Sequence, residues 1–231
     1  MRKIVITGAS GFVGTHLSGY LRQCGFPLAA DNLRQTKTLP VTEPAAAIIH
    51  LAGKAHDHSG TADAAAYFEV NTELTRTVFE QFLQSEASIF IHFSTVAAIT
   101  DEHINGVLTE EAEPHPSTPY GQSKLKAEQL LQEAILPAGK KIFIIRPAMI
   151  HGPGDKGNLT LLYNIVAKGI PYPLAAYENQ RSFLSIDNLN YAVEKLLTQA
   201  GSIPSGIYNL VDDMPVSTNE VVRLIAKTTG R

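Results

Sequence analysis

The segment Thr7-Gly8-Ala9-Ser10-Gly11-Phe12-Val13-Gly14 decides the fold. It follows a short β-branched run at residues 3–7, which is typical of a buried parallel strand, and it leads into helical spacing of apolar residues over residues 12–24. Glycines at this junction allow a tight turn, a close approach of the backbone to a phosphate, and close packing of helix on strand. The segment therefore predicts a dinucleotide-binding turn, which is a more specific reading than a structural turn alone. Its expected cofactor contacts are Gly8, Ser10, Gly11, Phe12, Val13 and Gly14.

Asp31 ends a second predicted strand at residues 26–30 and lies 17 residues after Gly14 (31 − 14). An acid at about this position meets the adenosine ribose hydroxyls of NAD and repels the 2′-phosphate of NADP. NADP remains an alternative, because the side chain of Arg34 could bind its 2′-phosphate. Asp31 and Arg34 could also both be ordinary charged residues of a loop. The sequence favours NAD over NADP.

The composition is that of an ordinary globular protein. The chain has 231 residues, 44% of them hydrophobic and 18% charged, with a formal net charge of −3. This balance does not indicate a nucleic-acid binder or a membrane-surface binder. The single Cys24 excludes an internal disulfide framework, and no apolar run approaches the roughly 20 residues that span a bilayer. We expect a soluble cytoplasmic protein.

Short apolar runs alternate with amphipathic helical patterns, which predicts an α/β fold with a doubly wound parallel sheet (Rossmann-like). Residues 33–44 have no helical pattern, and at most residues 39–42 form an edge strand. We expect a dinucleotide-binding domain at residues 1–150. A substrate lobe should follow at residues 151–231, with an element around residues 182–200 returning to the first domain. The predicted strands are at residues 3–7, 26–30, 47–51, 88–93, 141–145, 182–186 and 206–210, and the predicted helices are at residues 12–24, 67–83, 120–136, 159–167, 189–197 and after Ser217.

Thr95, Tyr120 and Lys124 form the candidate catalytic set. Thr95 follows a predicted strand, where ligands of open α/β sheets bind, and Tyr120 and Lys124 share one face of a predicted helix. A phenol with a pKa near 10 is a poor base at neutral pH, but a neighbouring ammonium and an oxidised nicotinamide both favour the phenolate. Tyr120 is then the general base for a substrate alcohol, and Thr95 positions the alcohol oxygen. Each residue alone would read as structural.

Three further features lie near this set. Leu51-Ala52-Gly53 ends a buried strand with small residues suited to a close cofactor contact. Asn71 interrupts the apolar face of a helix, so it is either a buried structural amide or a residue that ties neighbouring strands together near the cofactor. His56-Asp57-His58 allows a metal reading, but the spacing lacks a further ligand set, and we expect no metal site.

These motifs resemble the extended short-chain dehydrogenase/reductases of the NAD-dependent epimerase/dehydratase group, which act on nucleotide sugars. The resemblance covers nearly the whole chain. It is carried by TGASGFVG at residues 7–14, HLAG at residues 50–53, FST at residues 93–95, YGQSK at residues 120–124 and RPAMIHGPG at residues 146–154. It implies that Thr95, Tyr120 and Lys124 are catalytic and that Pro147 lies beside the nicotinamide. It also implies that Arg181 binds the nucleotide diphosphate and that Asn158 binds the sugar nucleotide. The helices at residues 67–83 and 120–136 would form a homodimer contact, although their apolar residues could equally face the sheet.

The resemblance narrows the reaction. The dehydratase branch has Asp-Glu directly after the catalytic Thr, whereas this chain has Val96-Ala97, so dehydration is not expected. His151 stands where the family usually has Tyr, and we expect it to fill that place in a loop. Family members usually continue for several tens of residues, so we expect the substrate lobe to be truncated.

The expected activity is an NAD-dependent 4-epimerase of UDP-hexoses or UDP-N-acetylhexosamines. The alternatives are an NAD(P)H-dependent reductase of UDP-4-keto sugars in surface-polysaccharide synthesis, and a non-catalytic dinucleotide-sensing protein or inactive fragment. The epimerase and the reductase would use the same three residues, and the intact set of Thr95, Tyr120 and Lys124 argues against the non-catalytic alternative.

Overall fold

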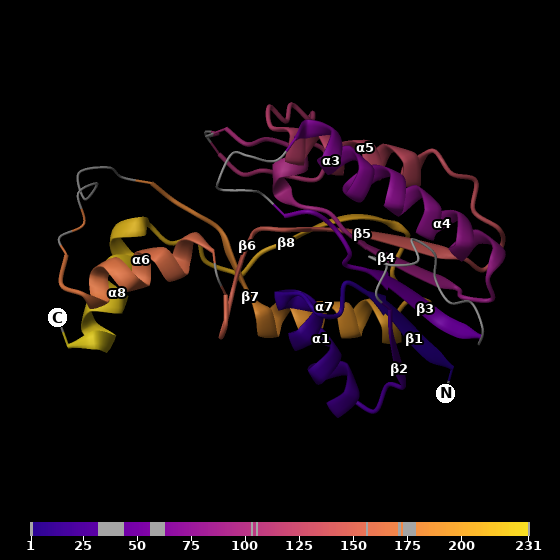
Figure 1. Ribbon diagram of the computed structural model, residues 1–231, viewed down its shortest axis with the longest axis horizontal. Coiled ribbons are helices and arrows are strands. Elements are labelled where there is room, and N and C mark those ends of the chain that lie inside the picture. Colours follow the sequence, from indigo (N-terminus) through magenta and orange to yellow (C-terminus); the bar gives the residue numbers. More distant parts are fainter. Residues whose placement is uncertain are drawn as a thin grey trace. The chain divides into compact units, whose positions relative to one another are not determined.

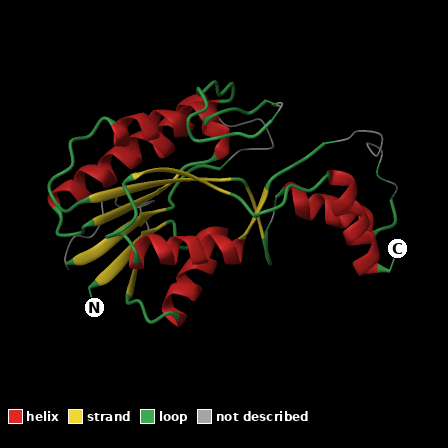
Figure 2. Cartoon of the chain, turned by 180° about the vertical axis from the view of Figure 1, so that it is seen from behind, coloured by secondary structure: helices red, strands yellow, loops and turns green. Residues whose placement is uncertain are grey.

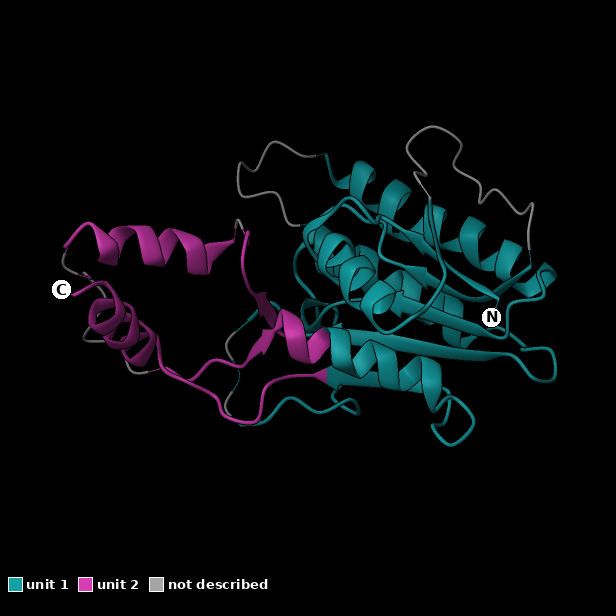
Figure 3. Cartoon of the chain, turned by 90° about the horizontal axis from the view of Figure 1, so that it is seen from below, with its two compact units in different colours: residues 1–147, 190–209 teal, residues 148–189, 210–231 magenta. Residues whose placement is uncertain are grey.

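A computed structural model describes residues 2–31, 44–55, 63–102, 104, 106–155, 157–170, 172 and 179–230. These residues form two units (Figure 3). Unit 1 comprises Met1–Pro147 and Asn190–Asn209, and unit 2 comprises Ala148–Leu189 and Leu210–Arg231. The predicted roles of these parts, dinucleotide binding and substrate binding, stay predictions.

The described part of unit 1 is organised around one sheet with the strand order β2-β1-β3-β4-β5-β8 (Figure 1). The pairs β1–β2, β1–β3, β3–β4 and β4–β5 are all parallel. The order reverses at β1, so the ends of β1 and β3 form the switch point where such sheets bind ligands. The strands are β1 (Lys3–Thr7), β2 (Leu28–Asp31), β3 (Ala45–His50), β4 (Ile89–Phe93), β5 (Lys141–Pro147) and β8 (Gly206–Leu210).

Helices cover both faces of this sheet, which makes the doubly wound architecture predicted from the sequence (Figures 1 and 2). One face carries α1 (Phe12–Gln23) and α7 (Ile186–Thr198). The other face carries α3 (Ala64–Phe68), the π-helical turn η1 (Glu69–Glu73), α4 (Leu74–Gln84) and α5 (Pro119–Gln132). Because both faces are covered, the central strands are mostly apolar, as is typical of parallel strands, with Thr7, His50 and His92 as buried polar residues.

The largest side chains of the core lie between the sheet and α4. The rings of Phe82 and Phe79 pack against Phe90 of β4, with centroids 5.2 and 5.3 Å apart, and all three are almost fully buried. Lys140 closes the end of this helix. Its ammonium donates three hydrogen bonds of 2.6–2.9 Å to carbonyl oxygens at the α4 C-terminus, those of Phe82, Ser85 and Ala87. A cation suits the negative end of the helix dipole.

Unit 2 has a small parallel sheet of β6 (Met149–His151) and β7 (Phe183–Ser185). It also contains α6 (Asn158–Ala167) and α8 (Thr218–Thr229), which pack on each other. Ser217 caps α8 through a capping box with Glu220, as the sequence pattern predicts, and Gly230 ends the helix with φ of 71°.

Several predicted boundaries are wrong in detail. The single helix predicted at residues 67–83 begins at Ala64 and is interrupted by the π-helical turn. The helix predicted at residues 120–136 ends at Gln132, and the strand β6 was not predicted because its three residues are too few to give a pattern. The possible edge strand at residues 39–42 lies outside the described residues. Within the described residues, no helix has the length and apolar character needed to cross a membrane.

Candidate active site

The glycine turn after β1 leaves no room for side chains. Gly8 has φ of 71°, and a Cβ placed on it would lie 2.7 Å from the backbone nitrogen of Ala52. A Cβ on Gly14 would lie 2.3 Å from the carbonyl oxygen of Gly8. The turn after β1 therefore touches both the start of α1 and the loop after β3. This close packing requires glycine at both positions.

The start of α1 is suited to a phosphate. Its N-cap is Gly11, which has no side chain to bond the first N–H groups of the helix. The helix has no acidic residue in its first turn, so the positive end of its dipole is not offset by a carboxylate. The turn thus presents bare backbone N–H groups at the switch point of the sheet. These features fit the pyrophosphate of a dinucleotide.

A buried polar chain supports the loop that carries Ala52 and Gly53. Thr7 Oγ1 accepts a hydrogen bond from the Ala52 N–H (3.2 Å) and is joined to His50 Nδ1 (2.8 Å). The other ring nitrogen of His50 is joined to Thr75 Oγ1 at 3.1 Å. Burial, with the charge of Lys124 nearby, lowers the pKa of His50 to about 3. His50 is therefore a neutral structural link between β1, β3 and α4 at neutral pH.

Asn71 is fully buried, which agrees with the predicted buried amide, and it joins a loop to a helix where a tie between neighbouring strands was the other alternative. It accepts from the Lys54 N–H (2.8 Å) and donates to the Lys54 carbonyl (3.1 Å) and to Ser123 Oγ (3.0 Å). The loop after β3 is thereby joined to α5. Asn71 lies in the π-helical turn, a feature that often marks functional positions because it re-aims side chains out of the regular helix.

Thr95, Tyr120 and Lys124 come together at the end of β4. Thr118 caps α5 by accepting from the Gly121 N–H (3.1 Å), and Pro119 occupies its first turn. The Thr95 hydroxyl forms a hydrogen bond with the Tyr120 phenol. Lys124 Nζ donates to the Phe93 carbonyl oxygen at 2.7 Å. The helix thus holds the phenol and the ammonium on the face that the sequence spacing predicts.

The electrostatics of this set differ from the sequence-based expectation. Burial raises the pKa of Tyr120, and the hydrogen bond from Thr95 only partly opposes this rise. Burial lowers the pKa of Lys124 to about 8, with the charge of Glu128 acting in the opposite direction. The Lys124 ammonium donates to the Phe93 carbonyl, and the surroundings of the phenol together raise the Tyr120 pKa, so Tyr120 keeps its proton at neutral pH.

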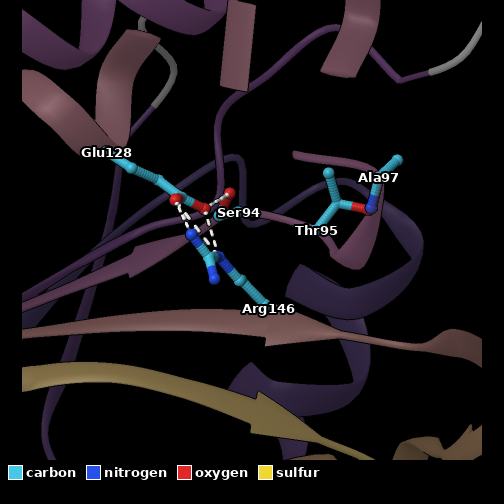
Figure 4. Close-up of polar contacts among 5 residues, drawn as sticks. All are labelled: Ser94, Thr95, Ala97, Glu128 and Arg146. Carbon is cyan, nitrogen blue, oxygen red and sulfur yellow. Dashed lines mark hydrogen bonds and ion pairs between the residues drawn. The ribbon is translucent and has the colours of Figure 1, made fainter. Parts of the chain in front are cut away.

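The sequence analysis missed an ion pair behind this set. Arg146 Nε lies 3.0 and 3.1 Å from the two carboxylate oxygens of Glu128, and Arg146 Nη2 lies 2.5 Å from one of them. The Ser94 hydroxyl donates to the same carboxylate (Figure 4). Glu128 and Arg146 are both buried. Glu128 lies one turn after Lys124 on the same helix face and Arg146 is the second-last residue of the apolar strand β5, but neither signal identifies the two as partners.

The remaining predicted contacts are distributed over both units. Asp31 is the last residue of β2 and pairs in register with Thr7, so it lies at the carboxyl edge of the sheet. Pro147 is the last residue of β5. In unit 2, Asn158 begins α6, and Arg181 pairs its backbone with Val216 and is exposed. Arg34 and the His56-Asp57-His58 segment lie outside the described residues.

His151 has a structural setting within unit 2. Its Nε2 lies 3.6 Å from an Asp212 carboxylate oxygen, and its ring packs edge-on against Phe183. The same carboxylate accepts from the Ser185 N–H and from the Asn188 side chain. His151 therefore belongs to a polar cluster at the start of α7.

Comparison with known proteins agrees with this geometry. A UDP-glucose 4-epimerase of Vibrio cholerae is 30% identical over 97% of this chain and 75% of its own length. A GDP-6-deoxy-D-mannose reductase of Pseudomonas aeruginosa is 25% identical over 97% of this chain and 79% of its own length. Among solved structures, RMD from Pseudomonas aeruginosa complexed with NADPH has a TM-score of 0.81 and 25% identity, and the match covers 100% of this chain and 83% of that one.

The pattern of the NAD dependent epimerase/dehydratase family matches residues 4–210, which include the glycine turn, the end of β4 and all of α5. This chain belongs to that family and is an NAD-dependent enzyme.

Proposed function

We propose that the chain is a nucleotide-sugar 4-epimerase that acts on UDP-hexoses or UDP-N-acetylhexosamines. The observation that carries the proposal is the hydrogen-bonded pair of Thr95 and Tyr120 at the end of β4, with Lys124 anchored one turn further along α5. The similarity to a UDP-glucose 4-epimerase at 30% identity supports the choice of reaction.

In this proposal Tyr120 takes the proton of the sugar C4 hydroxyl, and Thr95 holds the same oxygen in place. Bound NAD would supply the hydride acceptor for the sugar C4 carbon, and an epimerisation would consume no net cofactor. Burial holds the Tyr120 pKa above its usual value, so the phenol is a weak base until positive charge arrives nearby. The oxidised nicotinamide carries such a charge, and buried Lys124 adds to it. This coupling would restrict proton removal to the loaded site.

The residues after Thr95 argue against dehydration. Val96 and Ala97 form the short turn η2 (Val96–Ala98), and neither side chain can donate or accept a proton. A dehydratase needs an acid and a base for the elimination step, and the positions directly after Thr95 supply neither.

The proposed substrate contacts are Thr95 with the sugar C4 oxygen, Arg181 with the nucleotide diphosphate and Asn158 with the sugar nucleotide. Gly8, Gly11 and Gly14 hold the cofactor pyrophosphate and Asp31 its ribose, with Pro147 beside the nicotinamide. NADP remains an alternative cofactor, since a solved relative was complexed with NADPH.

A homodimer through α4 and α5, in the cytoplasm, is the proposed assembly. The exposed positions of these helices are polar, among them Arg76, Glu80, Gln122, Lys126 and Gln129. A dimer interface on these helices would therefore be more polar and more hydrated than the apolar interface expected from the sequence. Light scattering of the purified protein tests it, and a monomer at all concentrations contradicts it.

The second candidate is a reductase of a nucleotide-linked 4-keto sugar, and the similarity to GDP-6-deoxy-D-mannose reductase favours it. The two reactions are distinguished by incubation with a panel of UDP-hexoses and UDP-N-acetylhexosamines. Epimer formation without net cofactor change supports the epimerase. Stoichiometric oxidation of NAD(P)H with a 4-keto sugar supports the reductase. If neither product forms, the non-catalytic alternative is the one that remains.

Tyr120→Phe tests the role of the phenol, and Tyr208→Phe is the matched control. The Tyr208 hydroxyl donates to the Pro204 carbonyl, away from the end of β4. We expect Tyr120→Phe to abolish turnover with NAD affinity retained and Tyr208→Phe to keep both. Turnover by Tyr120→Phe at the wild-type rate would remove Tyr120 from the mechanism.

A further inference from the structure

Consecutive residues at the end of β4 are bonded to successive turns of one face of α5. Lys124 donates to the Phe93 carbonyl oxygen, Ser94 donates to Glu128, and Thr95 is bonded to Tyr120. Tyr120, Lys124 and Glu128 follow one another at intervals of four residues, so the helix presents them along one stripe. Two of these bonds belong to the proposed catalytic set, and the Ser94–Glu128 bond is the one that the proposed mechanism does not use.

Glu128 is fixed from a third element. Arg146, near the end of β5, donates hydrogen bonds to both carboxylate oxygens (Figure 4). The Ser94 N–H donates to the Ile145 carbonyl at 2.7 Å. The ends of β4 and β5 and the α5 helix therefore meet at one carboxylate. Breaking such a pair on one side is strongly destabilising, but replacing both partners by well-packed uncharged residues is often neutral or stabilising. Stability alone gives little reason for a buried ion pair here.

The charges around Lys124 suggest another reason. Titratable groups that act on it or on which it acts are Glu128 on α5, His50 on β3 and His92 on β4, and Tyr120 lies one turn before it on α5. The Arg146 guanidinium is bonded to the Glu128 carboxylate from β5. Burial and the Lys124 charge lower the pKa of both histidines, so both are neutral at neutral pH. The pKa of Tyr120 is raised, so the phenol is neutral as well. Among these described groups, Glu128 supplies the negative charge that offsets the buried ammonium, and it raises the Lys124 pKa.

We propose that Glu128, oriented by Arg146, is a positioning residue of the active site: it ties the strand end that carries Thr95 to the helix that carries Tyr120 and Lys124, and it keeps the buried Lys124 charged. The inference rests on the proposed function only for its kinetic consequence. The titration midpoint of Lys124 can be measured without any enzymatic turnover.

Two variants separate this role from a merely structural one. Glu128→Gln keeps an acceptor for Ser94 but removes the charge and leaves Arg146 buried without a counter-charge. The double variant Glu128→Gln/Arg146→Met removes both charges. We expect Glu128→Gln to be less stable than the wild type and the double variant to recover much of that loss, because no unpaired buried charge remains.

The decisive measurement is the titration of Lys124, followed by the ¹³C signal of its ε-carbon in lysine-labelled protein and assigned with Lys124→Arg. We expect the Lys124 midpoint to fall in both variants, since both lack the carboxylate. The fall should be smaller in the double variant, because that variant also loses the positive charge of Arg146. The alkaline limb of the kcat profile should move to lower pH in both, with KM little changed. Above the new midpoint the charged fraction of Lys124 falls about tenfold per pH unit, and kcat should fall with it.

A double variant with wild-type stability and an unchanged Lys124 midpoint would overturn the proposal and leave the pair a structural one. If Glu128→Gln does not fold, the double variant gives the same decision. If none of the sugars is turned over, the proposed function fails, but the Lys124 titration still decides the role of Glu128.

Discussion

Gly121 is the third residue of α5, next to Tyr120, and its replacement by alanine gives the sharpest test of the site geometry. A Cβ at this position would lie 2.4 Å from the Ala97 carbonyl oxygen and 2.9 Å from Pro116 Cβ. Ordinary contacts of this kind are near 3.5 Å, so the helix start or the turn after Thr95 must move by about 1 Å. The backbone oxygen cannot rotate away as a flexible side chain could.

The magnitude follows from two opposing effects. Alanine is better than glycine inside a helix by about 1 kcal/mol. Overpacking against backbone costs about 3 kcal/mol, the upper part of the usual range. The net loss for Gly121→Ala is therefore about 2 kcal/mol, or roughly 4–8 °C in Tm for a protein of this size. A displacement of about 1 Å beside Tyr120 should also lower kcat by about a hundredfold.

Gly19→Ala is the matched control, because Gly19 also lies inside a helix, α1, and a Cβ there would meet nothing within 4 Å. We expect it to raise the free energy of unfolding by about 1 kcal/mol and to leave kcat unchanged. Thermal and urea denaturation of the two variants, followed by circular dichroism, measure the difference. Equal stability of the two variants would refute the close approach of α5 to the Ala97 carbonyl.

Three further predictions concern single side chains. Lys140→Met removes three hydrogen bonds at the end of α4 and should lower the free energy of unfolding by about 2–3 kcal/mol in urea denaturation. The control Lys126→Met, on the exposed face of α5, should change the free energy of unfolding by less than about 0.5 kcal/mol. The Lys124 pKa is about 8 in the folded protein and 10.5 in the unfolded chain, so the unfolded chain binds more protons between these values and wild-type stability should rise with pH across that window. The free energy of unfolding of the wild type should rise by about 3 kcal/mol relative to that of Lys124→Met (10.5 − 8 = 2.5, times about 1.36). A difference between the two proteins that stays constant with pH would contradict the burial of a charged Lys124. Asp31→Ala should narrow the preference for NAD over NADP in fluorescence titrations, and an unchanged preference would show that Asp31 does not contact the ribose.

The glycine turn and the doubly wound sheet were predictable because their signals are local. Gly8 and Gly14 lack room for a Cβ, and the strands need continuous apolar residues because helices cover both faces of the sheet. The stripe of Tyr120 and Lys124 was likewise fixed by helical spacing. Helix ends were less predictable, since the end of α5 at Gln132 and the π-helical turn at Asn71 depend on packing against other elements.

The sequence by itself determined the family, the fold class and which side chains carry the proposed chemistry, because each of these depends on residues close together along the chain. Only the tertiary structure decided how those side chains are charged and held. Glu128 and Arg146 are 18 residues apart and Ser94 and Glu128 are 34 residues apart, and no periodicity reveals such pairs. The lowered pKa of Lys124 and the raised pKa of Tyr120 come from burial beneath several elements at once. Desolvation is a property of the packed molecule, so the sequence alone did not reveal that burial raises the Tyr120 pKa.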